Sequence, residues 1–129
     1  MKESGRHIVY VEDDVEMIEL VKLILERKGY KVSGASGGQE GWEIIKSELP
    51  DLVLLDLMMP DVDGWEVFQM MRDEKTTSEI PVIVITAKAQ NIDRVLGLHI
   101  AKVEDYITKP FKPEDLVVSV ERFLEKQLT

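Results

Sequence analysis

The sequence contains no cysteine, so neither disulfide bonds nor thiolate chemistry can take part in its fold or its function. It also has no apolar run of membrane-spanning length, and the segment from Met1 to Arg6 lacks the apolar core of a signal peptide. These absences predict a cytoplasmic protein that makes no contact with a membrane. With 129 residues, the chain can form one hydrophobic core, and we expect a single domain over 1–129.

Positive charge is scarce as well. The 16 Lys and Arg residues are outnumbered by 25 Asp and Glu residues, which gives a formal net charge of −9. A surface of that sign repels the phosphate backbone, because nonspecific nucleic-acid binding depends on clustered basic side chains. We therefore expect this chain to bind no nucleic acid directly, and we interpret its charge mainly as a source of solubility.

Two glycine-rich patterns that hold bound phosphates are also missing. The chain has neither G-x-G-x-x-G nor the Walker A pattern, so we expect no bound nucleotide. We interpret Gly37-Gly38 as a turn instead. Zinc is not indicated either, since we interpret His7 and His99 as structural or surface residues.

What the sequence does contain is a regular alternation of short apolar runs and longer amphipathic stretches, which is typical of βα units. The apolar runs that predict strands are 8–11, 30–35, 52–55, 82–85 and 105–108. The stretches that predict helices have their apolar residues within 17–25, 42–49, 65–71, 91–101 and 113–124. Strict alternation of this kind predicts an α/β fold with a five-stranded parallel sheet and helices on both faces.

Reactive side chains follow four of the predicted strands, at the edge where parallel sheets bind their ligands. These residues are Glu12, Asp13 and Asp14 after the first strand, Asp56 after the third, Thr86 and Ala87 after the fourth, and Lys109 after the fifth. Asp13 or Asp14 could equally cap a helix. Three or four carboxylates in one pocket repel one another, however, unless a cation holds them. An all-oxygen set of ligands favours a hard cation such as Mg²⁺.

Lys109 indicates what else the site receives. An ammonium group that faces a carboxylate–metal site suits an incoming group with several negative oxygens, and a phosphoryl group is the commonest of these. A carboxylate such as that of Asp56 can be the nucleophile and carry the phosphoryl group as an acyl phosphate. The metal ion and Lys109 would then stabilise the charge on the transferring group.

Four segments in this order resemble the receiver domains of two-component response regulators. They are Glu12-Asp13, the stretch from Leu54 to Gly64 that contains Asp56, Thr86-Ala87, and the stretch from Tyr106 to Phe111. The resemblance covers about 6–128. It implies a flavodoxin-like sheet with strand order 2-1-3-4-5. It also implies a phosphorelay protein that is not a true enzyme and catalyses only its own phosphorylation and dephosphorylation.

The resemblance implies a role for each matching residue. Asp56 would accept the phosphoryl group from the phosphohistidine of a sensor histidine kinase or a phosphotransfer protein. Asp13 and Asp56 would bind Mg²⁺ directly, together with the backbone carbonyl of Met58, and Glu12 would act through a metal-bound water. Lys109 would pair with Asp56 before phosphorylation and with the phosphoryl group afterwards.

The resemblance also implies a switch. Thr86 would move toward a phosphoryl oxygen, Tyr106 would follow from an outward to an inward position, and the small side chain of Ala87 would let the backbone approach the phosphoryl group. The Lys109–Pro110 peptide bond is expected to be cis. One departure concerns the segment 100–106, which lacks the usual glycine and is one residue longer than the family pattern.

Two rival functions were considered. A hydrolase that uses an aspartyl phosphate usually has a second acid two residues after its nucleophile, where this chain has Met58. A receiver that binds a partner without being phosphorylated would not need the intact set of site residues. The chain ends at Thr129 without a further domain, which fits either a stand-alone regulator or a piece of a larger one.

The expected oligomeric state is a monomer or a weak dimer. Receivers of winged-helix transcription factors form a charge-paired dimer through the fourth helix, the fifth strand and the fifth helix. Here the fifth-helix positions where basic residues are expected hold Ser119 and Glu121, and Glu125 adds another acid. Acids that face acids across a two-fold axis repel one another twice.

Overall fold

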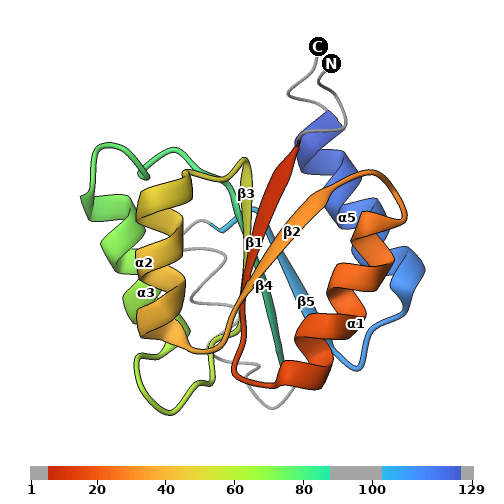
Figure 1. Cartoon of the computed structure of the whole chain (residues 1–129), viewed down its shortest axis with the longest axis horizontal. Coiled ribbons are helices and arrows are strands. Elements are labelled where there is room, and N and C mark those ends of the chain that lie inside the picture. Colours follow the sequence, from red (N-terminus) through yellow and green to blue (C-terminus); the bar gives the residue numbers. More distant parts are fainter. Residues whose placement is uncertain (1–5, 88–102, 126–129) are drawn as a thin grey trace.

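A computed structural model describes residues 6–87 and 103–125. Its elements are β1 (His7–Val11), α1 (Val15–Glu26), β2 (Lys31–Ala35), α2 (Gly38–Glu48), β3 (Leu52–Leu55), α3 (Gly64–Asp73), β4 (Val82–Ala87), β5 (Asp105–Lys109) and α5 (Pro113–Glu125). The five strands form one parallel sheet in the order β2-β1-β3-β4-β5 (Figure 1). This confirms the predicted fold and strand order. The helix expected over 91–101 lies outside the described residues.

The sheet separates two layers of helices. Helices α1 and α5 cover one face and α2 and α3 cover the other (Figure 1). Because successive residues of a strand point to opposite faces, each strand contributes to two cores. On β1, Ile8 and Tyr10 join the core beneath α1 and α5, while Val9 and Val11 join the core beneath α2 and α3. Strands β3 and β4 alternate in the same way, which explains why their sequences are apolar at every position.

Side-chain caps start two of the helices close to the reactive edge of the sheet. Asp14 accepts hydrogen bonds from the amides of Glu16 and Met17 and begins α1. Asp63 accepts one from the amide of Glu66 and begins α3. The capping alternative considered for the acidic run after β1 is therefore correct for Asp14.

Two small differences from the sequence predictions concern the second βα unit. Gly38 is the first residue of α2, so only Gly37, with a φ of 120°, belongs to the preceding turn. Tyr30 precedes β2 and is buried in the core beneath α1 and α5.

His7 has a structural role, as expected, because its Nε2 lies 2.8 Å from Ser33 Oγ. In the part of the chain that is described, no helix combines the length and the apolarity that a bilayer crossing requires.

Candidate functional site

An acidic cluster lies at the carboxyl edge of the sheet. Glu12, Asp13 and Asp56 can each offer an oxygen such that all three oxygens lie within 4.8 Å of one another. Glu12 and Asp56 are 1% and 3% exposed, whereas Asp13 is exposed. The predicted convergence of these residues is therefore confirmed, and the cluster opens to solvent on the side of Asp13.

Backbone hydrogen bonds fix the two buried acids just beyond their strands. The amide of Glu12 donates to the carbonyl of Ala35 over 3.0 Å, and the amide of Asp56 donates to the carbonyl of Val11 over 3.0 Å. These bonds continue the β1–β2 and β1–β3 ladders by one step. The backbone of both acids is consequently held in place by the central strands, as a precisely arranged site requires.

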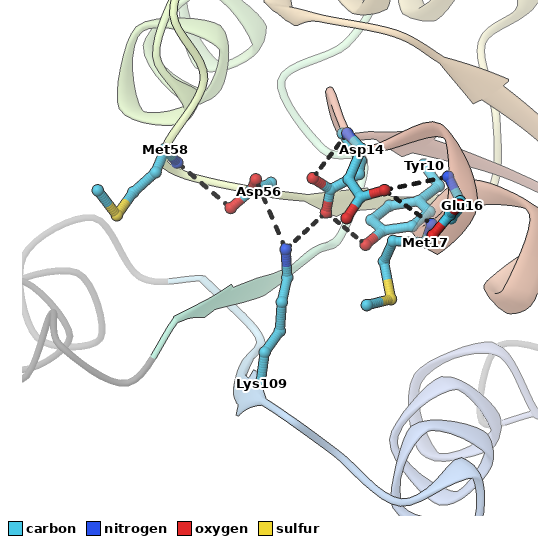
Figure 2. A network of polar contacts seen from close by, with 8 residues as sticks. Tyr10, Asp14, Glu16, Met17, Asp56, Met58 and Lys109 are labelled. Atoms are coloured by element: carbon cyan, nitrogen blue, oxygen red, sulfur yellow. Dashed lines mark hydrogen bonds and ion pairs between the residues drawn. The ribbon is translucent and has the colours of Figure 1, made fainter.

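Lys109 extends from the end of β5 into the acidic cluster (Figure 2). Its Nζ donates to Glu12 Oε1 over 2.8 Å and lies 3.7 Å from Asp56 Oδ2. The sequence placed this ammonium on Asp56, but the structure places it closer to Glu12. Its peptide bond to Pro110 is cis, as expected.

Tyr10 is a polar neighbour that sequence reasoning missed. Its hydroxyl donates to Glu12 Oε1 over 2.8 Å, the same oxygen that receives Lys109. The sequence holds a signal for this contact, because residues two apart on a strand point to the same face. Within the apolar run of the first strand, however, the sequence pattern predicts only a core position for Tyr10.

The two buried carboxyls have opposite pKa shifts. Burial, together with the charge of Glu12, raises the pKa of Asp56 to about 6. Burial also acts to raise the pKa of Glu12, but hydrogen bonds from Lys109 and Tyr10 outweigh it and hold that pKa below its usual value. The ammonium of Lys109 thus stabilises the negative charge of Glu12 well and that of Asp56 poorly.

The other residues singled out in the sequence lie on β4, on β5 and in the loop after β3. Thr86 is fully buried, and its Oγ1 has no hydrogen-bond partner within 6–87 and 103–125. Ala87 is exposed at the end of β4. Tyr106 is half-buried and packs against the core beneath α2 and α3. Met58 has an exposed side chain, and its amide donates to Asp56 Oδ1 over 3.3 Å.

The loop between β3 and α3, which carries Met58, is held at two further points. Asp61 accepts hydrogen bonds from the amides of Gly38 and Gln39 at the start of α2, over 3.2 and 3.1 Å. These backbone donors, that of Gln39 foremost, lower the pKa of Asp61. The amide of Gly64 donates to the carbonyl of Leu57 over 3.0 Å. The site is thus bounded by a loop tied to two helices.

Comparison with known proteins identifies the family. Residues 8–121 match the model of the response regulator receiver domain. The chain belongs to this family. It is 41% identical over 120 residues to the transcriptional regulatory protein CseB of Streptomyces coelicolor and 38% identical over 122 residues to the alkaline phosphatase synthesis transcriptional regulatory protein PhoP of Bacillus subtilis. These alignments cover 93% and 95% of this chain but 50% of each relative, so the chain spans about half their length.

Solved structures agree with this assignment. A CheY-like response regulator receiver domain protein from Methanospirillum hungatei has a TM-score of 0.85 at 31% identity, with 95% of each chain covered. A putative response regulator from Chloroflexus aurantiacus has a TM-score of 0.86 at 30% identity, with 94% of this chain and 98% of that chain covered. The protein is therefore a receiver domain of a two-component response regulator and not a conventional enzyme.

The segment that departs from the family pattern is partly described. The amide of Glu104 donates to the carbonyl of Val82 over 2.8 Å, and the amide of Val82 donates to Glu104 Oε1 over 2.7 Å. Arg72 Nη2 from α3 lies 3.9 Å from the same carboxylate oxygen. The receiver domain thus fastens the residue before β5 to the first residue of β4.

The donor set of this receiver domain fits a magnesium ion. The available ligands are all carboxylate oxygens, which Mg²⁺ prefers over nitrogen or sulfur ligands. Within 6–87 and 103–125, Lys109 is the one cation paired with these three carboxylates, and it pairs with Glu12 and Asp56, so this part of the cluster keeps an excess of negative charge. A divalent cation would remove the repulsion that burial of Asp56 beside Glu12 creates.

Proposed function

We propose that residues 1–129 form a single receiver domain that accepts a phosphoryl group on Asp56. The donor is the phosphohistidine of a sensor histidine kinase or a phosphotransfer protein, and the reaction depends on Mg²⁺. The observation that carries the proposal is the convergence of Glu12, Asp13 and Asp56 beside the ammonium of Lys109. A buried, poorly compensated carboxylate next to a cation site suits a nucleophile that becomes an acyl phosphate.

In the proposed transfer, a carboxylate oxygen of Asp56 attacks phosphorus while the bond from phosphorus to the donor imidazole breaks. Asp13, Asp56 and the carbonyl of Met58 would hold Mg²⁺ directly and Glu12 would hold it through a water, and the ion would neutralise the negative oxygens around phosphorus. Lys109 moves from Glu12 toward a phosphoryl oxygen. The small side chain of Ala87 leaves room for the backbone beside that group.

The proposed switch begins at Thr86. Its buried hydroxyl, which has no partner within the described ranges, would donate to a phosphoryl oxygen. Tyr106 would then change position on the neighbouring strand, because Thr86 and Tyr106 belong to the paired strands β4 and β5. A small local shift of this kind can bias a two-state surface.

The test is phosphorylation of the purified protein. With acetyl phosphate and Mg²⁺, intact-mass measurement should show one added phosphate on the wild type and none on Asp56→Asn. Chelation of Mg²⁺ should also prevent labelling, because the repulsion among the carboxylates and the phosphoryl oxygens is then uncompensated.

Asp73→Asn, which changes an exposed acid on α3, serves as the matched control and should label like the wild type. Equal labelling of Asp56→Asn would contradict the assignment of the acceptor. No labelling of the wild type by any phosphodonor would favour the rival reading of a receiver that binds a partner without being phosphorylated.

The output of the switch is proposed from the relatives. CseB and PhoP are named as transcriptional regulatory proteins and are about twice as long as this chain. We propose that phosphorylation is coupled to transcription, with any DNA contact made outside these residues, whose net charge is −9. The cytoplasmic location remains a prediction from the sequence.

Activation is expected to leave the domain monomeric or weakly dimeric. Asp105, an acid at the start of β5, is already engaged within the chain, since it accepts from Ser119 Oγ over 2.6 Å and lies 3.6 Å from Arg122 Nη1. An acid paired internally is less available to a second copy, and Glu121 adds repulsion across a two-fold axis. Light scattering with and without beryllofluoride measures the mass, and a structure of any dimer should place its contact outside β5 and α5. A dimer formed through β5 and α5 only on activation would refute this expectation.

A further inference from the structure

Tyr10 has no assigned role in phosphoryl transfer, yet its hydroxyl contacts the acidic cluster. Tyr10 is fully buried in the core beneath α1 and α5, and its ring extends from β1 toward the acidic cluster (Figure 2). Its hydroxyl donates to Glu12 Oε1 over 2.8 Å. A phenol buried at this depth needs a partner, and here the partner is a site carboxylate.

Glu12 receives donors from three parts of the chain. Tyr10 and Lys109 both donate to Oε1 over 2.8 Å, and the amide of Asp14 donates to Oε2 over 3.2 Å. Because Glu12 is 1% exposed, bulk water cannot replace a donor that leaves. The two donors on Oε1 are therefore partial substitutes, and each matters more when the other is gone.

We propose that Tyr10 is a positioning residue that keeps Glu12 satisfied when Lys109 leaves it for the phosphoryl group. This inference rests on the proposed function, in which Lys109 moves between the two positions. With Tyr10 present, the departure of Lys109 leaves Glu12 Oε1 with one donor. Without the hydroxyl, the same departure would leave this buried charged oxygen with no donor from the described protein residues, so Lys109 would be held more strongly on Glu12.

The test compares two ligands on Tyr10→Phe. Beryllofluoride, which imitates the phosphoryl group, draws Lys109 away from Glu12, so its affinity should fall about tenfold, the value of one hydrogen bond to a charged group. Mg²⁺ alone makes no such demand, and its affinity measured by calorimetry should change by less than about threefold. A merely structural defect would lower both affinities together.

Tyr30→Phe is the matched control. Its hydroxyl also donates to a glutamate, Glu125 Oε2 over 3.1 Å, but it joins the end of α5 and lies outside the acidic cluster. Because Glu125 is exposed, this variant should lose less stability than Tyr10→Phe, and it should keep both affinities. The comparison separates the loss of a tyrosine–glutamate hydrogen bond in general from its loss at Glu12.

A double variant keeps the test sharp if Tyr10→Phe folds poorly. In the background of Glu12→Gln the buried charge is gone, so at a Mg²⁺ concentration that saturates this background, adding Tyr10→Phe should leave beryllofluoride affinity unchanged. A tenfold loss in that background, or none in the single variant, would overturn the inference while the proposed function stood. If the wild type bound no beryllofluoride with Mg²⁺, the proposed function would fail and the inference with it.

Discussion

Asp56→Asn is expected to raise the free energy of unfolding by about 2 kcal/mol at about pH 7.5 when no divalent cation is present. Burial and the charge of Glu12 raise the pKa of Asp56 from 3.8 to about 6, which means that the folded protein resists ionisation of this carboxyl. The full difference between these two pKa values corresponds to about 3 kcal/mol of free energy. The pKa of about 6 already includes the attraction of Lys109, 3.7 Å away. We expect a smaller gain because the folded protein can relax around the ionised carboxylate.

The pH dependence has a definite sign. Between 3.8 and about 6 the folded wild type keeps a proton on Asp56 that the unfolded chain has already released. The free energy of unfolding therefore falls as pH rises through this window, and the penalty is complete above it. Chemical denaturation of both proteins should give curves that converge near pH 3.5 to 4 and separate at neutral pH.

Magnesium provides the internal check on this prediction. Saturating Mg²⁺ should stabilise the wild type, because it binds the folded cluster, and should stabilise Asp56→Asn much less. Asp73→Asn, the exposed control, should be as stable as the wild type, and Mg²⁺ should stabilise it as much as the wild type. A variant that was no more stable than the wild type at neutral pH, with cations chelated, would show that Asp56 carries no such penalty.

Gly64→Ala is expected to cost about 3 kcal/mol of stability and to weaken Mg²⁺ binding. A Cβ at this position would overlap the carbonyl oxygen of Asp56 and would lie 2.7 Å from Leu57 Cα. Both atoms belong to the backbone, so no side-chain rotation can make room. The start of α3 or the loop that carries Met58 must shift, and the shift displaces the carbonyl proposed as a metal ligand.

Gly29→Ala separates steric pressure at the site from a general glycine effect. Gly29 has a φ of 96° and no atom within 4 Å of an added Cβ, so its cost is backbone strain of about 1–2 kcal/mol. It lies after α1, at the end opposite the acidic cluster, and should keep Mg²⁺ affinity. Calorimetric titration with Mg²⁺ and denaturation of both variants test the contrast. Unchanged Mg²⁺ affinity in Gly64→Ala would argue against the displacement.

The fold and the acidic cluster could be predicted from the sequence because simple periodicity determines them. Strands that are apolar at every position must be covered on both faces, and the carboxyl ends of parallel strands share one edge. Glu12, Asp13, Asp56 and Lys109 therefore had to converge, whatever the details of their side chains. The structure confirms this convergence.

What could not be predicted depends on distances of an ångström or less. Lys109 reaches both Glu12 and Asp56, and its preference for Glu12 depends on burial and on a second donor that no periodicity reveals. The sequence predicts only a loop residue at Asp61, yet its side chain caps α2, which begins 23 residues earlier in the chain. Such contacts join segments distant in sequence, and one sequence alone does not align them.

The alternation of the strands has a consequence for which insertions this protein can tolerate. Tyr10, Glu12 and Lys109 share the parity of the residues beneath α1 and α5, whereas Thr86 and Tyr106 share that of the residues beneath α2 and α3. Strand β5 thus carries one residue of each set, Tyr106, proposed to report the phosphoryl group, and Lys109, proposed to bind it. A single residue inserted within β4 before Thr86 would move Thr86 to the other face of the sheet, and one inserted in β5 between Tyr106 and Lys109 would do the same to Lys109.

The segment before β5 escapes that constraint. Its last residue, Glu104, forms two hydrogen bonds with Val82. From there β5 pairs with β4 without a break, from Asp105 opposite Ile83 to Lys109 opposite Ala87. The register of β5, and with it the side of the sheet on which Lys109 lies, is therefore fixed from Glu104 onward. We expect a residue added before Glu104 to leave Lys109 on the side where Glu12 and Asp56 lie.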